Sequence, residues 1–261
     1  MDRWRLIRSG RRDGPYNMAV DEAIFISLKA GASPPTIRFY GFEPPCLSLG
    51  YFQRVEGEID LEACHRLGIQ LVRRPTGGRA VLHDGELTYS VIARYDGRIF
   101  PKDLLATYRK ISSCILKGFE ILGLRGELTT LREKRVRPAH HSSPNCFASP
   151  SWYEVTIGGK KVVGSAQKRD RSFFLQHGSI LIDLSPDKYR AVFRLPYDGY
   201  EQFTCINDHL GGIDFDHLEQ ALTRGFQEEM EVELVEGPLG PQEEALVKRL
   251  LEERYLKEEW K

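Results

Sequence analysis

The chain has 261 residues, of which 41% are hydrophobic and 28% charged, a composition typical of a globular protein that needs no disulfide or metal to hold its core. Lys plus Arg and Asp plus Glu both number 37, and this zero net charge argues against a nucleic-acid-binding protein. No segment approaches the roughly 20 apolar residues of a membrane span, and the N-terminus lacks a signal-peptide pattern. We therefore expect a cytoplasmic protein with no nucleic-acid or membrane partner.

The first third of the chain alternates between predicted helices and strands. Apolar residues on almost every side of the segment at 17–30 predict a buried helix, and a second helix is expected at 58–67. Strands are expected at residues 36–40, 46–51, 70–74, 80–83 and 87–93.

A double glycine, Gly77-Gly78, interrupts two of these strands. Glycines allow backbone N–H groups to approach a ligand closely, and Arg74, Arg79 and His83 surround the turn with hydrogen-bond donors. The turn is therefore a candidate substrate-binding element. A β-bulge with exposed arginines explains the same fragment equally well.

A long helix is expected at residues 101–122, followed by a loop over 125–150 that contains three prolines and is long enough to be functional. The loop carries a basic run at 132–137, which could steer an acidic carrier protein but is more often a solvated segment. Cys146 follows this run, in a position where a thiol can be exposed and reactive.

The other four cysteines, at positions 46, 64, 114 and 205, lie in apolar or helical patterns typical of small buried residues. Because the total is five and no Cys or His cluster has zinc spacing, we expect free thiols and no metal site. Cys146 fits the buried interpretation least well.

A hairpin is predicted from strands at 152–157 and 160–165 around Gly158-Gly159. Its register pairs Thr156 with Lys161 and places Glu154 on the same face. An exposed pair of Lys161 with Glu154, which contributes little to stability, is the default interpretation of this lysine.

Small residues follow the hairpin in Gly164-Ser165-Ala166 and leave room for a ligand against the strand. On the next strand, at 173–183, His177-Gly178 could line a pocket, although a hydrogen-bonded core histidine is the favoured alternative. The remaining predicted elements are helices at 186–193, 215–230 and 241–255 and a strand at 231–235. The many hairpins, together with the absence of GxGxxG, predict a single domain over residues 1–261 of the α+β class, with mixed, largely antiparallel sheets and packed helices.

In order along the chain, five motifs resemble the lipoate–biotin ligase and octanoyltransferase superfamily: residues 17–22, 47–53, 73–83, 161–167 and 255–260. The resemblance covers nearly the whole chain and implies a biotin/lipoate ligase-like catalytic domain. Arg79 stands where ATP-dependent ligases usually have a third glycine, and Cys146 precedes the lysine strand. Both features are similar to the octanoyltransferase branch of Gram-positive-type lipoate assembly.

The resemblance implies that Cys146 forms an acyl thioester and that Lys161 favours its thiolate form. Octanoyl would pass from acyl carrier protein to a lysine of a lipoyl domain, such as the H protein of the glycine cleavage system. Thioester exchange needs no ATP, so no cofactor is expected. Backbone N–H groups near Gly77, Gly78 and Gly164 would bind the oxyanion.

Three alternatives remain open from the sequence. An ATP-dependent lipoate ligase would use the same fold with Cys146 incidental, and an octanoyl amidotransferase would move octanoyl between lipoyl domains. A non-catalytic module that binds acyl groups or lipoyl domains would keep its function in a Cys146→Ala variant.

Overall fold

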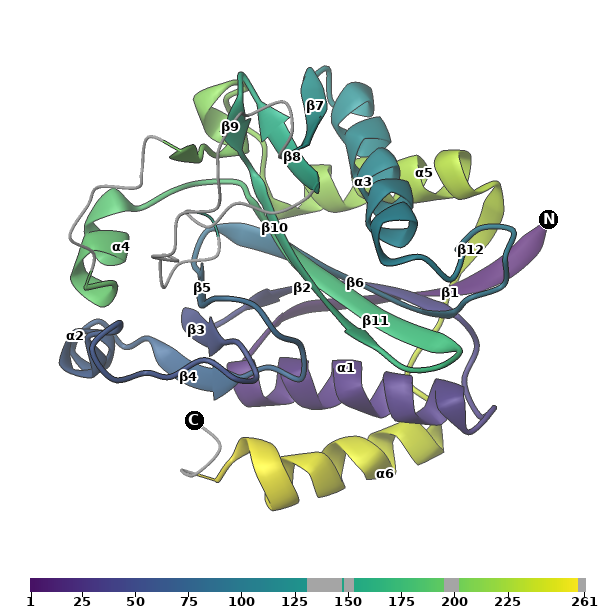
Figure 1. Ribbon diagram of the computed structural model, residues 1–261, viewed down its shortest axis with the longest axis horizontal. Coiled ribbons are helices and arrows are strands. Elements are labelled where there is room, and N and C mark those ends of the chain that lie inside the picture. Colours follow the sequence, from purple (N-terminus) through teal and green to yellow (C-terminus); the bar gives the residue numbers. More distant parts are fainter. Residues whose placement is uncertain (131–146, 148–152, 195–201, 258–261) are drawn as a thin grey trace.

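The computed structural model describes residues 1–130, 147, 153–194 and 202–257. At its centre lies a six-stranded sheet with strand order β10-β11-β6-β2-β1-β12 (Figure 1). Its strands, in chain order, are β1 (Asp2–Arg12), β2 (Thr36–Phe42), β6 (Glu86–Arg94), β10 (Val163–Arg169), β11 (Phe173–Leu181) and β12 (Val232–Glu236). Strand β1 runs parallel to β2 and β12, whereas the other neighbouring strands are antiparallel. The predicted α+β class with mixed, largely antiparallel sheets is confirmed.

Two three-stranded sheets flank the central one. The first, ordered β4-β3-β5, comprises β3 (Cys46–Leu49), β4 (Gln70–Arg73) and β5 (Val81–His83). The second, ordered β7-β8-β9, comprises β7 (Gly126–Thr130), β8 (Tyr153–Ile157) and β9 (Lys160–Lys161). Lys161 ends β9 in this small sheet and Val163 begins β10 in the central sheet, so the chain crosses between the two sheets at Val162.

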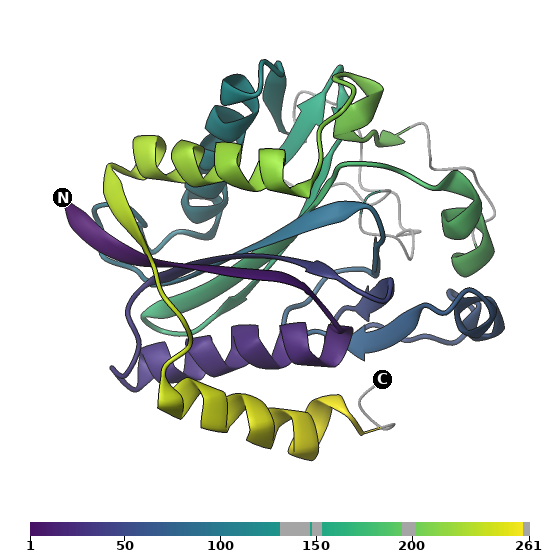
Figure 2. The same ribbon diagram turned by 180° about the vertical axis from the view of Figure 1, so that it is seen from behind.

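Helices cover both faces of the central sheet (Figures 1 and 2). On one face α1 (Gly14–Lys29) packs against α6 (Pro241–Leu250), and on the other α3 (Leu104–Ile121) packs against α5 (Phe215–Met230). Shorter helices are α2 (Leu61–Arg66), α4 (Pro186–Val192), a 3₁₀ turn at Ile206–Asp208 and a π-helical turn at Leu251–Tyr255. Helix α1 lies between the sheet and α6, which explains its apolar residues on nearly every side.

Aspartates begin four of these helices. The side chains of Asp13, Asp60, Asp103 and Asp214 each accept a hydrogen bond from a backbone N–H in the first helical turn, which satisfies a donor that otherwise has no partner. For this reason α3 begins after Asp103 rather than at Pro101, and α2 begins after Asp60 rather than at residue 58.

Two strands were not predicted. Strand β1 carries its buried residues Trp4, Leu6 and Ile7 between arginines, and this arginine-rich pattern does not indicate a strand in the sequence. Its arginines are accommodated by distant acidic partners, as in the bond of Arg5 to Glu243. Strand β7 pairs with β8, so the start of the predicted loop at 125–150 is wrong: residues 126–130 form a strand. Within the described residues, no helix combines the length and apolar character needed to cross a bilayer.

Candidate active site

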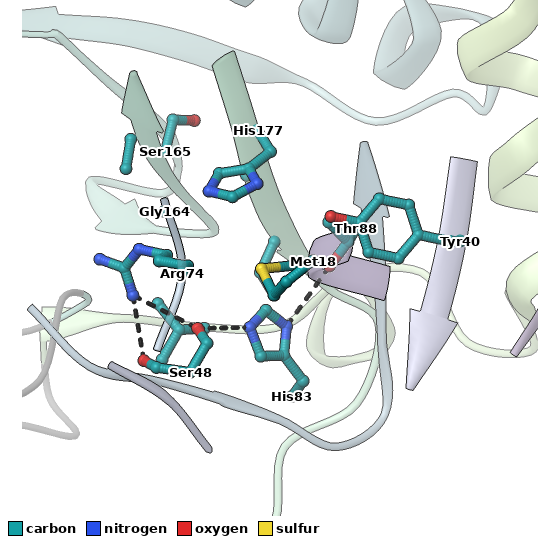
Figure 3. A pocket seen from close by; sticks show the side chains of 13 residues that line it. Met18, Tyr40, Ser48, Arg74, His83, Thr88, Gly164, Ser165 and His177 are labelled. Atoms are coloured by element: carbon teal, nitrogen blue, oxygen red, sulfur yellow. Dashed lines mark hydrogen bonds between the residues drawn. The ribbon is translucent and has the colours of Figure 1, made fainter. Parts of the chain in front are cut away.

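A pocket lies where the small sheet β4-β3-β5 meets strands β10 and β11 of the central sheet (Figure 3). Its lining includes seven of the predicted substrate-binding residues: Arg74, His83, Gly164, Ser165, Ala166, His177 and Gly178. Six further lining residues were not predicted: Met18, Tyr40, Ser48, Val81, Thr88 and Ser179. Met18 and Ser48 stand within two of the sequence motifs, whereas Tyr40 and Thr88 come from strands that meet only in the folded chain.

Gly178 lets strand β10 lie close to β11 at the pocket wall. A Cβ atom at this position would lie 2.6 Å from Oγ of Ser165 and 2.8 Å from Cε1 of Tyr89. Oγ of Ser165 and the hydroxyl of Tyr89 are themselves 2.7 Å apart. Only glycine fits here without moving both hydroxyl groups.

His177 is held by a hydrogen-bonded chain that begins at Asp21. Asp21 is fully buried and accepts hydrogen bonds of 2.8 Å from both Arg38 and Tyr40. Burial alone would raise the pKa of Asp21, but the charge of Arg38 and the hydrogen bonds from His177 and Tyr40 lower this pKa below its ordinary value. Because this carboxylate is ionised, Nδ1 of His177, 3.1 Å away, carries the proton. Nε2 then accepts from the hydroxyl of Thr76 at 2.7 Å.

His83 takes part in a second chain of the same type. Its Nε2 lies 2.8 Å from Oγ of Ser48. Its Nδ1 lies 3.3 Å from Oγ1 of Thr88 (Figure 3) and 3.5 Å from Oε1 of Glu86. Thr88 in turn donates to Oε2 of Glu86 at 2.6 Å. Both chains therefore connect a buried carboxylate, an imidazole and a hydroxyl group, but in the second chain the Glu86 carboxylate reaches His83 through Thr88.

Both chains converge on Arg74, whose guanidinium group is directed at protein oxygens. It donates to Oγ1 of Thr76 at 3.1 Å and to Oγ of Ser48 at 3.3 Å. Since each hydroxyl accepts from this guanidinium, its own proton is available for a histidine Nε2. Nη2 of Arg74 also donates to the carbonyls of Gly77 and Arg79, both at 2.7 Å. The predicted binding of a ligand by Arg74 stays a prediction, and its visible contacts hold the turn.

The Gly77-Gly78 turn has its carbonyls tied to the protein. The carbonyl of Thr76 accepts from the N–H of Tyr51 at 2.9 Å, and that of Gly77 accepts from Arg74. Because a trans peptide is planar, the following N–H groups, those of Gly77 and Gly78, point the opposite way. Neither N–H has a hydrogen-bond partner among the residues that the structure describes. Two neighbouring N–H groups of this kind can bind an anion.

Arg79 and the two glycines form a turn beside the pocket rather than part of its lining. The side chain of Arg79 is directed at Glu58, with Nη1 3.2 Å from Oε1. Gly78 adopts a φ of 94°, and a Cβ there would lie 3.9 Å from that of Ala166 in the pocket wall. The turn therefore forms an edge of the pocket next to β10.

The predicted hairpin is present, with Gly158 and Gly159 at φ of 57° and 76°, and Thr156 pairs with Lys161 as expected. Nζ of Lys161 lies 3.4 Å from Oε1 of Glu154. The predicted pair is therefore confirmed. The expectation that it is exposed is wrong, because each residue is only 3% exposed. The cause is tertiary: the side chains on this hairpin face are covered by other parts of the fold.

Four cysteines behave as predicted for buried thiols. Cys46, Cys64, Cys114 and Cys205 are buried and form no disulfide. Burial raises the pKa of each of these thiols, to about 11 for both Cys64 and Cys205. All four are therefore poor nucleophiles at neutral pH.

Two predicted features lie outside the described residues: Cys146 and the basic run at 132–137. Phe147, which directly follows Cys146, is described and buried. Among the described residues, no group of three or more His, Cys, Asp or Glu side chains has an arrangement that could hold a metal ion.

Fold and sequence together define the class of this protein. The model of the lipoyl protein ligase A/B catalytic domain family matches residues 13–227. The chain belongs to this family, as its five motifs predicted.

Similar proteins narrow the class further. The octanoyltransferase LipM of Kyrpidia tusciae is 44% identical over all of this chain and 98% of its own length. The octanoyltransferase LipM of Bacillus subtilis is 39% identical over 98% of this chain and 97% of its own length. The predicted octanoyltransferase branch is therefore confirmed as the group that this chain resembles over its full length.

Two solved structures share the fold over the whole chain. A lipoate-protein ligase A bound with ATP superposes with a TM-score of 0.84 at 29% identity and covers 98% of that chain. A bi-partite lipoate protein ligase from Thermoplasma acidophilum gives 0.82 at 28% identity and covers 96% of that chain.

Proposed function

We propose that this enzyme takes octanoyl from acyl carrier protein as a thioester on Cys146 and passes it to a lysine of a lipoyl domain. Octanoyl transfer is the activity named for relatives that match nearly the whole chain. Relatives of this identity and coverage support the same acyl transfer in lipoate biosynthesis here. The observation that carries the residue-level proposal is the buried ammonium of Lys161.

Contacts around Phe147 support a position of Cys146 near Lys161. The ring of Phe147 lies 5.7 Å from that of Phe203. Phe203 in turn forms a β-bridge with Lys161, and the N–H of Thr204 donates to the carbonyl of Lys161 at 2.9 Å. Because Cys146 directly precedes Phe147 in the sequence, these contacts of Phe147 support the proposal that Cys146 acts together with Lys161.

The reaction has two balanced steps. The thiolate of Cys146 attacks the thioester carbon of the donor, a new carbon–sulfur bond forms, and the carrier thiolate leaves and takes a proton from water. A neutral lysine amine of the acceptor then attacks the acyl-enzyme and forms a carbon–nitrogen bond. The carbon–sulfur bond breaks, the Cys146 thiolate leaves, and the amine gives up one proton to water. Lys161 stays charged in both steps and stabilises the thiolate as nucleophile and as leaving group. Neither step consumes ATP.

The turn beside the pocket supplies the second requirement of acyl transfer, a site for the oxyanion. The N–H groups of Gly77 and Gly78 have no hydrogen-bond partner among the described residues, which suits them to bind an anion, and Gly164 lies in the adjoining pocket wall. Fixed donors of this kind lose little energy to reorganisation when charge develops on the thioester oxygen.

The pocket suits the octanoyl tail because its imidazole and guanidinium groups already have partners, whereas Oγ of Ser179 has no hydrogen-bond partner among the described residues. Both ring nitrogens of His83 and of His177 face protein groups, and the guanidinium of Arg74 faces protein oxygens. Burial of each methylene contributes roughly 0.8 kcal/mol, so pocket depth can select the chain length.

An ATP-dependent ligase is the second candidate, favoured by the likeness to a lipoate-protein ligase structure bound with ATP. Against it stands Arg79, whose side chain is held by Glu58 at the turn. An octanoyl amidotransferase, which would take octanoyl from another lipoyl domain, shares the chemistry proposed for Cys146 and Lys161.

The proposed donor is octanoyl-acyl carrier protein, and the proposed acceptor is a lipoyl domain such as the H protein of the glycine cleavage system. The free thiols of the four described cysteines fit a reducing compartment, and we place the reaction in the cytoplasm.

The decisive experiment is intact mass after mixing with octanoyl-acyl carrier protein in the absence of ATP. We expect the wild type to gain one octanoyl group and Cys146→Ala to gain none. Addition of H protein should then remove the octanoyl group from the enzyme. A wild type that gains no mass without ATP but modifies H protein with octanoate and ATP would identify a ligase instead. Octanoyl transfer from octanoyl-H protein to a second lipoyl domain would identify an amidotransferase.

A further inference from the structure

We propose that Glu154 is a positioning residue for the acyl transfer, the permanent counter-ion that keeps the Lys161 ammonium charged and in place. This inference rests on the proposed function, since it assigns a partner to one of its two catalytic groups. The observation is the juxtaposition of two buried, oppositely charged side chains on neighbouring strands of one hairpin.

The backbone of Lys161 is fixed from two sides. Thr156 is its partner across the β8–β9 ladder, and the N–H of Thr204 donates to its carbonyl at 2.9 Å. Strand β8 is in turn held by β7, where the hydroxyls of Thr129 and Thr156 are 2.9 Å apart. The backbone at Lys161 therefore has little freedom to move, and the position of the ammonium group depends on the side chains around it.

Burial makes the charge of Lys161 dependent on a nearby anion. Its side chain is 4% exposed and that of Glu154 is 3% exposed. An ammonium group removed from water is costly unless an anion is close, and otherwise the neutral amine is favoured. In the proposed cycle Cys146 supplies that anion only while it is a thiolate. In the acyl-enzyme the sulfur is uncharged, and Glu154 is the described carboxylate that faces Lys161.

The position of Glu154 follows from strand geometry. Residues two apart on a strand share a face, so Glu154 lies on the same face as Thr156 and diagonally opposite Lys161. The nitrogen–oxygen separation of 3.4 Å exceeds the 2.7–2.9 Å typical of a tight charge-assisted hydrogen bond. At this spacing the carboxylate supplies a negative charge close to the ammonium without forming a tight hydrogen bond.

The test compares variants that separate charge from shape. Glu154→Gln keeps the size and removes the charge, whereas Glu154→Asp keeps the charge with a shorter reach. Glu127→Gln is the matched control, because it removes an exposed carboxylate from the neighbouring strand β7. The readouts are the rate of Cys146 alkylation by iodoacetamide, located by peptide mass, and the rate of octanoyl transfer in a single turnover.

We expect Glu154→Gln to slow both rates by roughly tenfold to a hundredfold, Glu154→Asp to retain more of each rate than Gln, and Glu127→Gln to match the wild type. The ultraviolet thiolate absorption, taken as the difference from Cys146→Ala, should fall in the same order. Wild-type or faster rates in Glu154→Gln would show that the carboxylate only competes for the ammonium, and would overturn the proposal. Equal losses in the Gln and Asp variants would also overturn it.

A variant that folds poorly still gives an answer. The alkylation rate of Glu154→Ala is measured with and without added formate, so that the same protein is compared under two conditions. The proposal requires formate to increase this rate. Absence of any increase counts against it. If the wild type itself gains no octanoyl group, the proposed function fails. If the wild type gains it and Glu154→Gln does so equally fast, only the role of Glu154 fails.

Discussion

Two buried ion pairs, Asp21–Arg38 and Glu154–Lys161, are built differently. On the pocket side, Asp21 and Arg38 are both 0% exposed, and their nitrogen–oxygen distance is 2.8 Å. The Asp21 carboxylate also accepts from Tyr40 at 2.8 Å and from Ser90 at 3.0 Å. On the hairpin side, Lys161 and Glu154 are equally buried but 3.4 Å apart.

The difference shows how similar burial can serve different ends. Asp21 has its lone pairs occupied by four donors, counting His177, so it anchors a chain of fixed polarity that ends at the turn. Such a saturated group has no capacity left for a substrate. The lysine pair, with its longer separation, holds a positive charge on the hairpin, and a positive charge is what the proposed thiolate chemistry requires.

The largest expected effect is on the saturated pair. Asp21→Asn leaves the Arg38 guanidinium buried without its counter-charge, and loss of one partner of a buried pair costs about 3–5 kcal/mol of unfolding free energy. Urea unfolding monitored by circular dichroism measures it. Asp187→Asn serves as the control, because its carboxylate is 96% exposed in a surface pair with Arg190. If Asp21→Asn lost no more unfolding free energy than Glu154→Gln, the two ion pairs would not differ in their contribution to stability.

A smaller effect is expected at the Gly77-Gly78 turn. In Gly78→Ala, a Cβ would be added at φ 94°, 2.9 Å from Nη2 of Arg74, which is itself bound to two carbonyls. We expect a loss of about 1–3 kcal/mol together with slower octanoyl transfer, since the Gly78 N–H would move. Gly97→Ala has a comparable φ of 75° and nothing within 4 Å of its Cβ, so it controls for backbone strain alone. Equal rates of octanoyl transfer in Gly78→Ala and Gly97→Ala would show that the turn does not bind the oxyanion.

The smallest effect is a pH dependence of stability that comes from His177. Burial lowers the pKa of His177 below its ordinary value of 6.5, although Asp21 favours the charged form. The unfolded chain therefore binds a proton at a higher pH than the folded one does. The stability contributed is fully present above about pH 6.5 and is lost as the pH falls toward the folded pKa, at up to about 1.4 kcal/mol per unit of separation.

Melting temperatures of the wild type and His177→Gln between about pH 7.5 and pH 5 test this dependence. We expect the wild type to lose stability toward acid more steeply than the variant. Parallel curves would show that His177 is not held neutral by its surroundings.

Several features could be read from local sequence. The double glycine at 158–159 predicted the hairpin and its register, which paired Thr156 with Lys161, because two-residue turns with positive φ fix the strands that they join. The pocket residues on β10 and β11, apart from Ser179, were predicted because small residues and a histidine next to glycine stand out locally. The four buried cysteines followed from their apolar neighbours.

The local patterns did not reveal which polar groups hydrogen-bond to one another in the folded protein. Arg74 looked like a donor for ligand, yet its partners are oxygens of Ser48, Thr76, Gly77 and Arg79. Asp21 and His177 stand 156 positions apart in the chain, and no periodicity links them. Strand β1 was missed because its arginines find acidic partners only across the fold.

The sequence by itself therefore determined most of the elements (though not strands β1 and β7), the hairpin register and, through its motifs, the family of this protein. Tertiary structure alone decided that the Lys161–Glu154 pair is buried, that two histidines are tied to carboxylates, and that Arg74 binds the carbonyls of Gly77 and Arg79 at the glycine turn. The physical reason is that periodicity and turn chemistry act over a few residues, whereas burial and hydrogen-bond partners depend on segments brought together by the whole fold.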